Sequence, residues 1–187
     1  LKVLVANRDQ VESLIYGTWL GRLSYRIRHL LNHNSKRNSR KNIHAHYDLG
    51  NGFYQRWLDA TMNYSSAWFE GDHSQSLSRA QNAKVRRALT EVGVMGGPAD
   101  QRVLEIGCGW GALAEMATLD AQAQVTGVTL STEQLGWAQR RLKAAGQWHR
   151  ADLRLQDYRD IQDEPFDAIV SIEMFEAVGQ SYWPTYF

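Results

Sequence analysis

RVLEIGCGWG, residues Arg102 to Gly111, is the stretch that decides the fold of this chain. Its first half is short and apolar with β-branched members, which is typical of a buried parallel strand. Three alternating glycines follow, and an apolar helical pattern resumes at Ala112. In a strand–turn–helix unit, glycines let the backbone turn tightly and let a nucleotide come close. The stretch therefore predicts a nucleotide site in a doubly wound α/β fold.

Two kinds of nucleotide fit this turn. The pattern GxGxxA from Gly107 is compatible with a dinucleotide site, and ExGxGxG from Glu105 with the first motif of S-adenosylmethionine (SAM) methyltransferases. A dinucleotide site places an acid on the ribose about 20 residues further on. The next expected strand, 124–128, instead runs into Thr129 with no acid beside it. These residues favour SAM and leave the dinucleotide as the alternative.

Composition limits the remaining classes. With 187 residues, 43% hydrophobic and 22% charged, the chain suits one globular domain and an appendage, and no apolar run approaches the ~18 residues of a membrane span. Cys108 is the single cysteine, which excludes an internal disulfide and suits a reducing, cytoplasmic compartment. We expect it to be a small buried side chain. His44 and His46 lack a third ligand, so no metal site is predicted.

Charge is concentrated near the N-terminus. The net charge is only +1, yet residues 13–47 hold seven Lys or Arg and no acid. Apolar residues recur there at helical spacing from Tyr16 to Leu31. We expect residues 1–41 to form a basic amphipathic helical arm and linker, either lying on an anionic membrane or packed on its own domain with a solvated basic face.

Residues 42–100 are expected to form an aromatic-rich lid and helical region. Seven aromatic residues fall between Tyr47 and Phe69, which is compatible with a pocket lining or with plain core packing. Within it we predict a turn at 50–52, a short helix at 53–58, and a longer helix at 75–92 capped by Ser76 or Ser78.

Residues 101–187 are predicted to be the N-terminal part of the nucleotide-binding α/β domain. After the glycine turn, strands are expected at 124–128, 152–155 and 168–172. Ser131 is expected to cap the helix before the third strand, with Gln134 as its capping-box partner. The carboxyl ends of parallel strands meet at one edge, so the loops after all four strands should converge on one crevice.

Five motifs, in order, resemble the cyclopropane-fatty-acid synthase family, which includes the mycolic acid cyclopropane synthases. They are HYDLGN at 46–51, YSSA at 64–67, EIGCGWG at 105–111, GVTLSxxQ at 127–134 and MFExVG at 174–179. The resemblance covers residues 42–187. It implies a Rossmann-like class I SAM-dependent methyltransferase that methylates the cis double bond of an unsaturated phospholipid acyl chain. The carbocation formed would give a cyclopropane or a methyl branch.

The resemblance also implies roles for residues. SAM contacts are implied for a set that spans the lid and the strand ends. The set is Tyr64, Ser65, Val103, Leu104, Glu105, Ile106, Gly107, Cys108, Gly109, Trp110, Gly111, Thr129, Leu130, Gln134, Tyr158, Arg159 and Ile172. In the family a bound bicarbonate is the base. Glu176 matches the carboxylate that holds it, and Ser66 stands where a Cys is usual, so both are predicted to be catalytic.

This sequence departs from the usual residues of the family at three positions. Ser66 replaces Cys, Ala177 replaces His and Gly52 replaces Asp. Ser66 keeps the bicarbonate contact if the backbone N–H provides it, and damages that contact if the thiol of the usual Cys provides it. These departures bear on the product, ring or branch, more than on the cofactor.

The family's sheet has seven strands, and four are found here. We therefore expect a fragment of a longer enzyme, truncated after the fourth strand, with further bicarbonate ligands beyond Phe187 and with 168–172 as an uncovered apolar edge. The expected partners are unsaturated phospholipids at the membrane surface and no nucleic acid, with a homodimer as an option. The expected location is the cytoplasm, with a peripheral position at the inner membrane face as an option.

Two other functions stay open. One is a nucleic-acid or small-molecule SAM methyltransferase. Enzymes that methylate base amino groups commonly have a Pro-Pro-Tyr/Phe type of motif after the fourth strand, where this chain has Glu173-Met174-Phe175-Glu176. The other is a non-catalytic SAM-binding or membrane-associated fragment.

Overall fold

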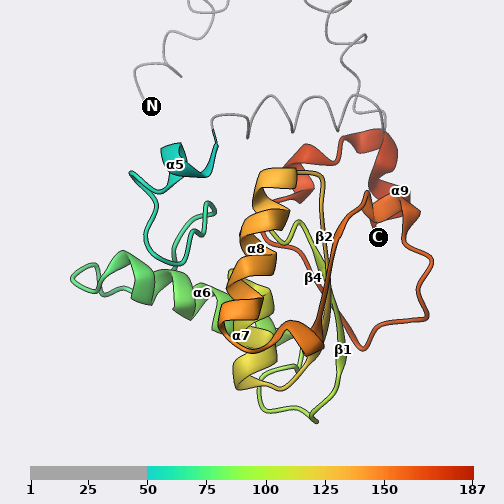
Figure 1. The fold of residues 1–187 in the computed structure, drawn as a ribbon, viewed down its shortest axis with the longest axis horizontal. Coiled ribbons are helices and arrows are strands. Elements are labelled where there is room, and N and C mark those ends of the chain that lie inside the picture. The colour runs from blue at the N-terminus through green and yellow to red at the C-terminus, as the bar shows by residue number, and fades with distance from the viewer. Residues whose placement is uncertain (1–49) are drawn as a thin grey trace, which may run out of the picture. The chain divides into compact units, whose positions relative to one another are not determined.

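The computed structural model describes residues 50–187 (Figure 1). Residues 1–49 lie outside the described part of the chain. The predictions for the basic arm, for His44 and His46, and for most of the HYDLGN motif therefore stay predictions. Within residues 50–187, no helix is long and apolar enough to cross a membrane.

Four parallel strands form the sheet. They are β1 (Arg102–Ile106), β2 (Gln124–Thr129), β3 (Ala151–Leu155) and β4 (Ala168–Val170), in the order β3-β2-β1-β4. The chain builds outward from β1 through β2 to β3 and then returns to place β4 on the other side of β1. The topological switch point thus lies at the carboxyl ends of β1 and β4, the place where such sheets bind ligands.

The fourth strand is shorter than the predicted 168–172. Pairing with β1 ends at Val170, which lies opposite Glu105. The Ser171 hydroxyl then donates to the carbonyl of Ile106 at 2.9 Å. At the end of β1 this carbonyl is thus bonded to a side chain of the segment after β4 instead of to a backbone N–H of β4. Among the described strands β4 is an edge strand, and Ile169 on it is 57% exposed.

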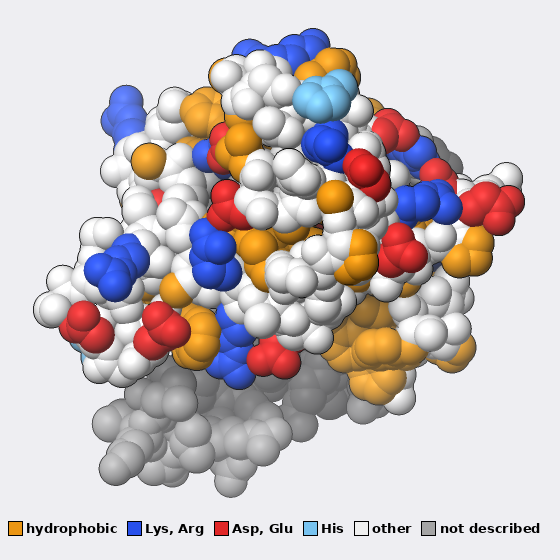
Figure 2. Space-filling model, turned by 90° about the horizontal axis from the view of Figure 1, so that it is seen from below, with side chains coloured by type: hydrophobic (Ala, Val, Ile, Leu, Met, Phe, Trp, Pro, Cys, Tyr) orange, Lys and Arg blue, Asp and Glu red, His pale blue; other side chains and the backbone are white. Residues whose placement is uncertain are grey.

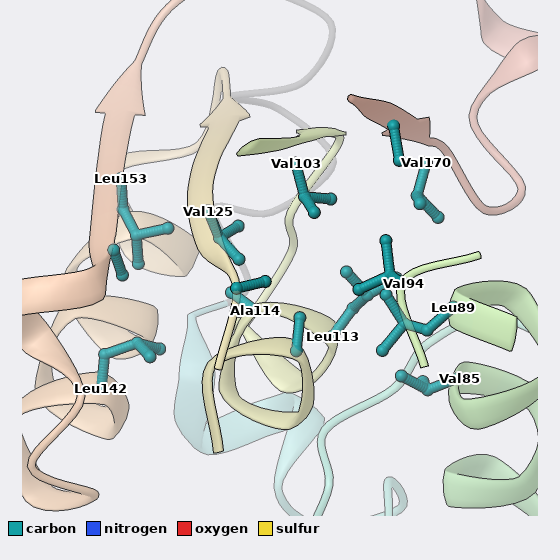
Figure 3. Close-up of a cluster of buried hydrophobic side chains, with 14 of the residues drawn as sticks. Val85, Leu89, Val94, Val103, Leu113, Ala114, Val125, Leu142, Leu153 and Val170 are labelled. Carbon is teal, nitrogen blue, oxygen red and sulfur yellow. The ribbon is translucent and has the colours of Figure 1, made fainter. Parts of the chain in front are cut away.

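Three longer helices cover one face of the sheet. These are α6 (Leu77–Glu91), α7 (Ala112–Asp120) and α8 (Thr132–Ala144). Figure 3 shows Val85 and Leu89 of α6, Leu113 of α7 and Leu142 of α8 gathered below the strands. Alternate strand residues such as Val103 and Val125 point into the same cluster, as the period of two in a strand requires. The other face carries a smaller cluster.

That smaller cluster holds Leu104, Ile106 and Val128, and the chain after β3 packs on it. Besides β4, this part of the chain contains only short helices: η2 (Tyr158–Asp160), η3 (Phe175–Ala177), η4 (Gln180–Tyr182) and α9 (Trp183–Tyr186). The helix η1 (Trp148–Arg150) precedes β3.

Side-chain caps set where the helices begin. Ser76 accepts a hydrogen bond from Arg79 N–H at 3.3 Å, which confirms it as the cap of α6. Ser131 accepts from Gln134 N–H at 3.3 Å, as predicted for α8. The reciprocal half of the predicted capping box is wrong: Ser131 N–H donates to Thr129 Oγ1 instead, and Thr129 Oγ1 donates to Gln134 Oε1.

The first described helix also differs from the prediction. A helix was expected at 53–58 after a turn, and α5 instead spans Asn51–Tyr54. The side chain of Asn51, the first residue of α5, bonds to two other parts of the fold and anchors the helix there. Its Nδ2 donates to Glu133 Oε2 at 2.9 Å, and its Oδ1 accepts from Trp110 Nε1 at 2.7 Å.

Surface charges are mixed on the face drawn in Figure 2, where Lys and Arg side chains are interspersed with Asp and Glu. Two ion pairs of the described residues are Arg86–Asp120 and Arg150–Asp100, each 2.6 Å long. Exposed pairs of this kind contribute about 0–1 kcal/mol each. This face therefore offers no uniform basic patch for a polyanion.

Candidate active site

The glycine turn joins β1 to α7 at the switch point. Gly107 and Cys108 N–H groups both donate to the carbonyl of Val128, at 2.9 and 3.0 Å. A Cβ on Gly111 would lie 2.8 Å from Cβ of Ala138, so glycine is needed there for close packing of α7 and α8. A Cβ on Gly109 would meet no atom within 4 Å. The turn therefore has open space at its centre, which a ligand can use.

Several residues predicted to contact SAM are buried around the turn. Val103, Leu104, Ile106 and Cys108 are at most 7% exposed. Burial raises the pKa of the Cys108 thiol, as expected for a small buried side chain rather than a nucleophile. Ile172 packs at the margin of the large core cluster, and Leu130 is half-buried.

Glu105 is a buried acid beside this turn. Its carboxylate accepts from Ala114 N–H in the first turn of α7, where Gly111 provides no side-chain cap. Burial raises the pKa of Glu105 to about 8. Its Oε2 is buried without a hydrogen-bond partner among the described residues. An unsatisfied buried acid at the end of β1 fits the polar amino-acid part of SAM, and we take this as agreement between the residues and that cofactor.

The end of β2 carries neutral polar groups instead of an acid. Thr129 Oγ1 accepts from Ser131 N–H at 3.2 Å and donates to Gln134 Oε1 at 3.1 Å. Within residues 50–187, no hydrogen bond engages Gln134 Nε2, so amide donors are available at this strand end. Such donors suit a ribose hydroxyl without the carboxylate of a dinucleotide site.

The end of β3 holds an ion pair that was not predicted. Arg159 forms two bonds to Asp157, Nε to Oδ1 at 2.8 Å and Nη2 to Oδ2 at 2.6 Å. The hydrogen bond to Asp157 raises the pKa of Arg159. The guanidinium also lies over the Tyr182 ring, 4.6 Å from its centroid. Tyr158 packs edge-on against Tyr186 at 5.4 Å. The predicted adenine contacts of Tyr158 and Arg159 stay predictions.

An aromatic cluster joins the lid to the glycine turn. Trp110 is buried, and its ring lies 5.1 Å from that of Tyr54. Tyr64 stands edge-on to Tyr54 at 5.8 Å and to Trp57 at 5.6 Å. Tyr64 and Trp57 stay 48% and 50% exposed, so the cluster is core on one side and surface on the other. The aromatic stretch is thus partly core packing and partly an exposed surface that can line a pocket.

Arg141 on α8 connects this cluster by hydrogen bonds to neighbouring carbonyl groups, and we call this set of bonds the Arg141 clamp. Its guanidinium donates to three carbonyl groups: Thr61 at 2.8 Å, Trp110 at 3.0 Å and Ala60 at 3.0 Å. Its Nε also lies 3.5 Å from Glu115. The clamp was not predicted because an arginine on a helix pattern reads as a solvated residue.

Ser66 meets an acid from the other end of the chain. Its N–H donates to Glu173 Oε1 at 2.9 Å, and its hydroxyl donates to the same oxygen. Glu176, the acid predicted to act with Ser66, is exposed on η3 and makes no hydrogen bond to another described residue. The structure therefore brings Ser66 together with Glu173 and not with Glu176.

Lys84 of α6 lies next to this contact. It donates to Ser65 Oγ and to Gln81 Oε1, both at 2.5 Å, while Gln81 Nε2 donates to the carbonyl of Ser65 at 2.8 Å. Desolvation lowers the pKa of Lys84 to about 8, against the attraction of Glu173. The sequence holds one signal for Lys84 and Gln81: they are polar residues on the inner face of the helix predicted at 75–92.

Comparisons with known proteins agree on one family. The family model described as mycolic acid cyclopropane synthetase matches residues 34–187. The tuberculostearic acid methyltransferase UfaA1 of Mycobacterium tuberculosis is 40% identical, over all of this chain and 44% of that protein. The cyclopropane-fatty-acyl-phospholipid synthase of Escherichia coli K12 is 43% identical, over 76% of this chain and 35% of that protein.

Solved structures agree as well. The crystal structure of mycolic acid cyclopropane synthase CmaA1 complexed with SAH and CTAB superposes with a TM-score of 0.72 at 35% identity. It covers 79% of this chain and 50% of that one. The chain thus spans half or less of the length of these relatives.

Proposed function

This chain belongs to the mycolic acid cyclopropane synthetase family of SAM-dependent methyltransferases, and we propose that the protein methylates the cis double bond of an unsaturated phospholipid acyl chain. The cofactor, when bound, supplies the methyl group as a sulfonium. The product would be a cyclopropane or a methyl-branched chain. The relatives' names include phospholipid, mycolic acid and tuberculostearic acid enzymes, so the acyl class is our proposal.

The observation that carries the proposal is the attachment of the aromatic cluster to the glycine turn. Trp110 belongs to the turn and packs against Tyr54, which in turn packs against Tyr64. An alkene is a weak nucleophile, so the two reactants must be held in line in a site that excludes water. Aromatic faces provide such surroundings and stabilise a developing carbocation.

The clamp of Arg141 supports the same arrangement. It ties the lid segment at residues 60–61 to the carbonyl of Trp110, so one guanidinium bridges the lid and the turn. A rigid link of this kind fixes the distance between a cofactor on the turn and an acyl chain under the lid.

A membrane surface is the place where such a substrate is found. The basic stretch 13–47 supports binding to anionic lipid, with the enzyme peripheral to the inner face of the membrane. The mixed charges in Figure 2 give no support to a nucleic-acid substrate on that face.

Two measurements test the proposal together. Calorimetric titration should show binding of SAM and not of NAD. Incubation with SAM labelled on its methyl group should place label in vesicles of unsaturated phospholipid and leave saturated vesicles unlabelled. Binding of SAM without label in lipid would support the non-catalytic alternative instead. Label in DNA or RNA would support the nucleic-acid alternative.

A further inference from the structure

Polar side chains recur every three residues along α6 and contact residues 59–68, which we call the lid segment. They are Ser78, Gln81, Lys84 and Arg87. The first and last of them hold the two ends of the segment. Ser78 Oγ donates to Asp59 Oδ2 at 2.6 Å, and the Arg87 guanidinium lies over the Trp68 ring, 4.2 Å from its centroid. Residues three apart are neighbours on a helix surface, so these contacts follow one another along α6.

The two central residues both hold Ser65. Gln81 is only 3% exposed, and its Nε2 donates to the carbonyl of Ser65 at 2.8 Å and to that of Asn63 at 3.4 Å. Lys84 Nζ donates to Ser65 Oγ and to Gln81 Oε1, both at 2.5 Å. The backbone and the hydroxyl of Ser65 are thus bonded to two side chains that also bond to each other. A buried network whose groups are satisfied in this way favours a single geometry.

Ser65 and its neighbour lie at the ligand end of the sheet. Ser66 donates its N–H to Glu173 Oε1 at 2.9 Å, and Glu173 comes three residues after the end of β4. The next residue, Met174, contacts the glycine turn, because a Cβ on Gly107 would lie 3.3 Å from Met174 Cγ. The two serines thus border the switch point, where such sheets bind ligands. Since the Ser65 hydroxyl accepts a bond from α6, its own hydrogen can be donated to a ligand there.

The charge of Lys84 strengthens its hold on Ser65. Hydrogen bonds from a charged donor are about twice as strong as neutral ones. Lys84 is half-buried, and desolvation lowers its pKa to about 8, against the attraction of Glu173 and of Asp59 in the lid segment. The remaining charged group beside it is Arg87, three residues further along the same helix. The lid segment is therefore held more tightly below about pH 8 than above it.

The effect of this titration on stability has the opposite sign. The pKa of Lys84 lies below its ordinary value of 10.5, so folding favours the neutral amine. The contribution of Lys84 to the free energy of unfolding therefore rises as pH increases from about 8 to about 10.5. A weaker hold on the lid segment in that range is thus separable from any loss of the fold.

We propose that Lys84 is a positioning residue for the cofactor. Together with Gln81 it fixes Ser65 and the adjoining backbone at the switch point, so that their donors are in place before the cofactor binds. The inference rests on the proposed function, because the ligand in question is SAM. Preorganised donors raise affinity because binding no longer has to order them.

Hydrogen–deuterium exchange on the unliganded full-length protein tests the positioning without a ligand. Lys84→Met keeps the length of the side chain and removes the donor, so the amides of residues 63–68 should exchange about tenfold faster than in the unmodified protein. Lys84→Arg keeps a charged donor and should leave this exchange within about threefold. Lys143→Met is the matched control, since Lys143 is exposed at the far end of α8 and lies 4.7 Å from the centroid of Trp148.

Calorimetric titration with SAM then tests the consequence for binding. At pH 7 the Kd should rise by about tenfold in Lys84→Met and in Gln81→Met. The double variant should be at most about threefold weaker than either single variant, because both side chains act on the same Ser65. Between pH 7 and pH 9 the unmodified protein should lose about fivefold in affinity relative to Lys84→Arg, which stays charged. Titration of SAM itself is common to both proteins and cancels in this ratio.

Three results would overturn the role of Lys84. They are unchanged exchange of residues 63–68 in Lys84→Met, SAM affinity of Lys84→Met equal to that of Lys143→Met, and the same pH dependence of affinity in the unmodified protein and Lys84→Arg. Failure of the unmodified protein to bind SAM would instead refute the proposed function, and the exchange rates would then decide by themselves whether Lys84 holds the lid segment.

Discussion

Replacing Arg141 by Met tests how the lid is tied to the glycine turn. Methionine keeps most of the apolar stem of Arg141 and removes its guanidinium. The Arg141 side chain is only 12% exposed. Three carbonyl groups then lose a charged donor. Hydrogen bonds to charged groups contribute about 1.5–3 kcal/mol each, and some of this is recovered because water can reach the exposed Ala60.

The net loss in the free energy of unfolding should be about 3 kcal/mol. At about 2–4 °C per kcal/mol this lowers Tm by about 6–12 °C. Affinity for SAM should fall by about tenfold, because the lid no longer holds Trp110 and its turn in place. Urea unfolding and calorimetric titration of SAM on the same samples measure both effects.

Arg140→Met is the matched control. Arg140 is the preceding residue of α8, is exposed, and its guanidinium lies 5.9 Å from the centroid of Trp137. Its loss should change stability by less than about 0.5 kcal/mol. Equal stability of the two variants, or unchanged SAM affinity in Arg141→Met, would refute the clamp.

Three further predictions concern the turn and the strand before it. The pKa of Glu105 is raised from 4.5 to about 8, so the fold favours the neutral carboxyl. The contribution of this group to the free energy of unfolding is complete below about pH 4.5 and is lost as pH rises through about 8. Glu105→Gln should therefore flatten the pH dependence of stability, and at pH 9 it should be more stable than the unmodified protein by about 2 kcal/mol or more. Urea unfolding of both proteins at about pH 6 and about pH 9 measures this. The same change in stability between the two pH values in both proteins would contradict it. Gly111→Ala should destabilise by about 2–4 kcal/mol, because a methyl group meets Ala138 at a φ of +83. Gly109→Ala meets open space and should cost only about 1 kcal/mol while weakening SAM binding, as paired melting and titration would show.

Much of the sheet could be predicted because its signals are local. The bounds of β1 match the apolar run before the glycines, and the serine caps of α6 and α8 are set by side chains that bond to their own helix. The end of β4 was misplaced because it depends on Ser171 reaching the carbonyl of Ile106, a contact between distant parts of the chain.

The candidate site was only partly predictable for the same reason. Motifs identified the glycine turn and the Ser66 segment, but not the residues that connect them. Arg141 and Glu173 act through contacts 31–107 residues away in sequence, and the left-handed backbone at Glu173 has no sequence signal in a glutamate. The EMFE segment offered two acids, and only Glu176 matched a family motif.

Mass spectrometry of lipids from cells that produce the full-length protein tests the central claim most directly. Unsaturated phospholipids should gain one CH₂ unit, with loss of the double bond if the product is a cyclopropane and a retained double bond if it is a methyl branch formed by proton loss. The added carbon should carry the label of methionine fed to the cells. Unchanged lipids in cells that hold folded, SAM-binding protein would contradict the assignment of an acyl-chain methyltransferase.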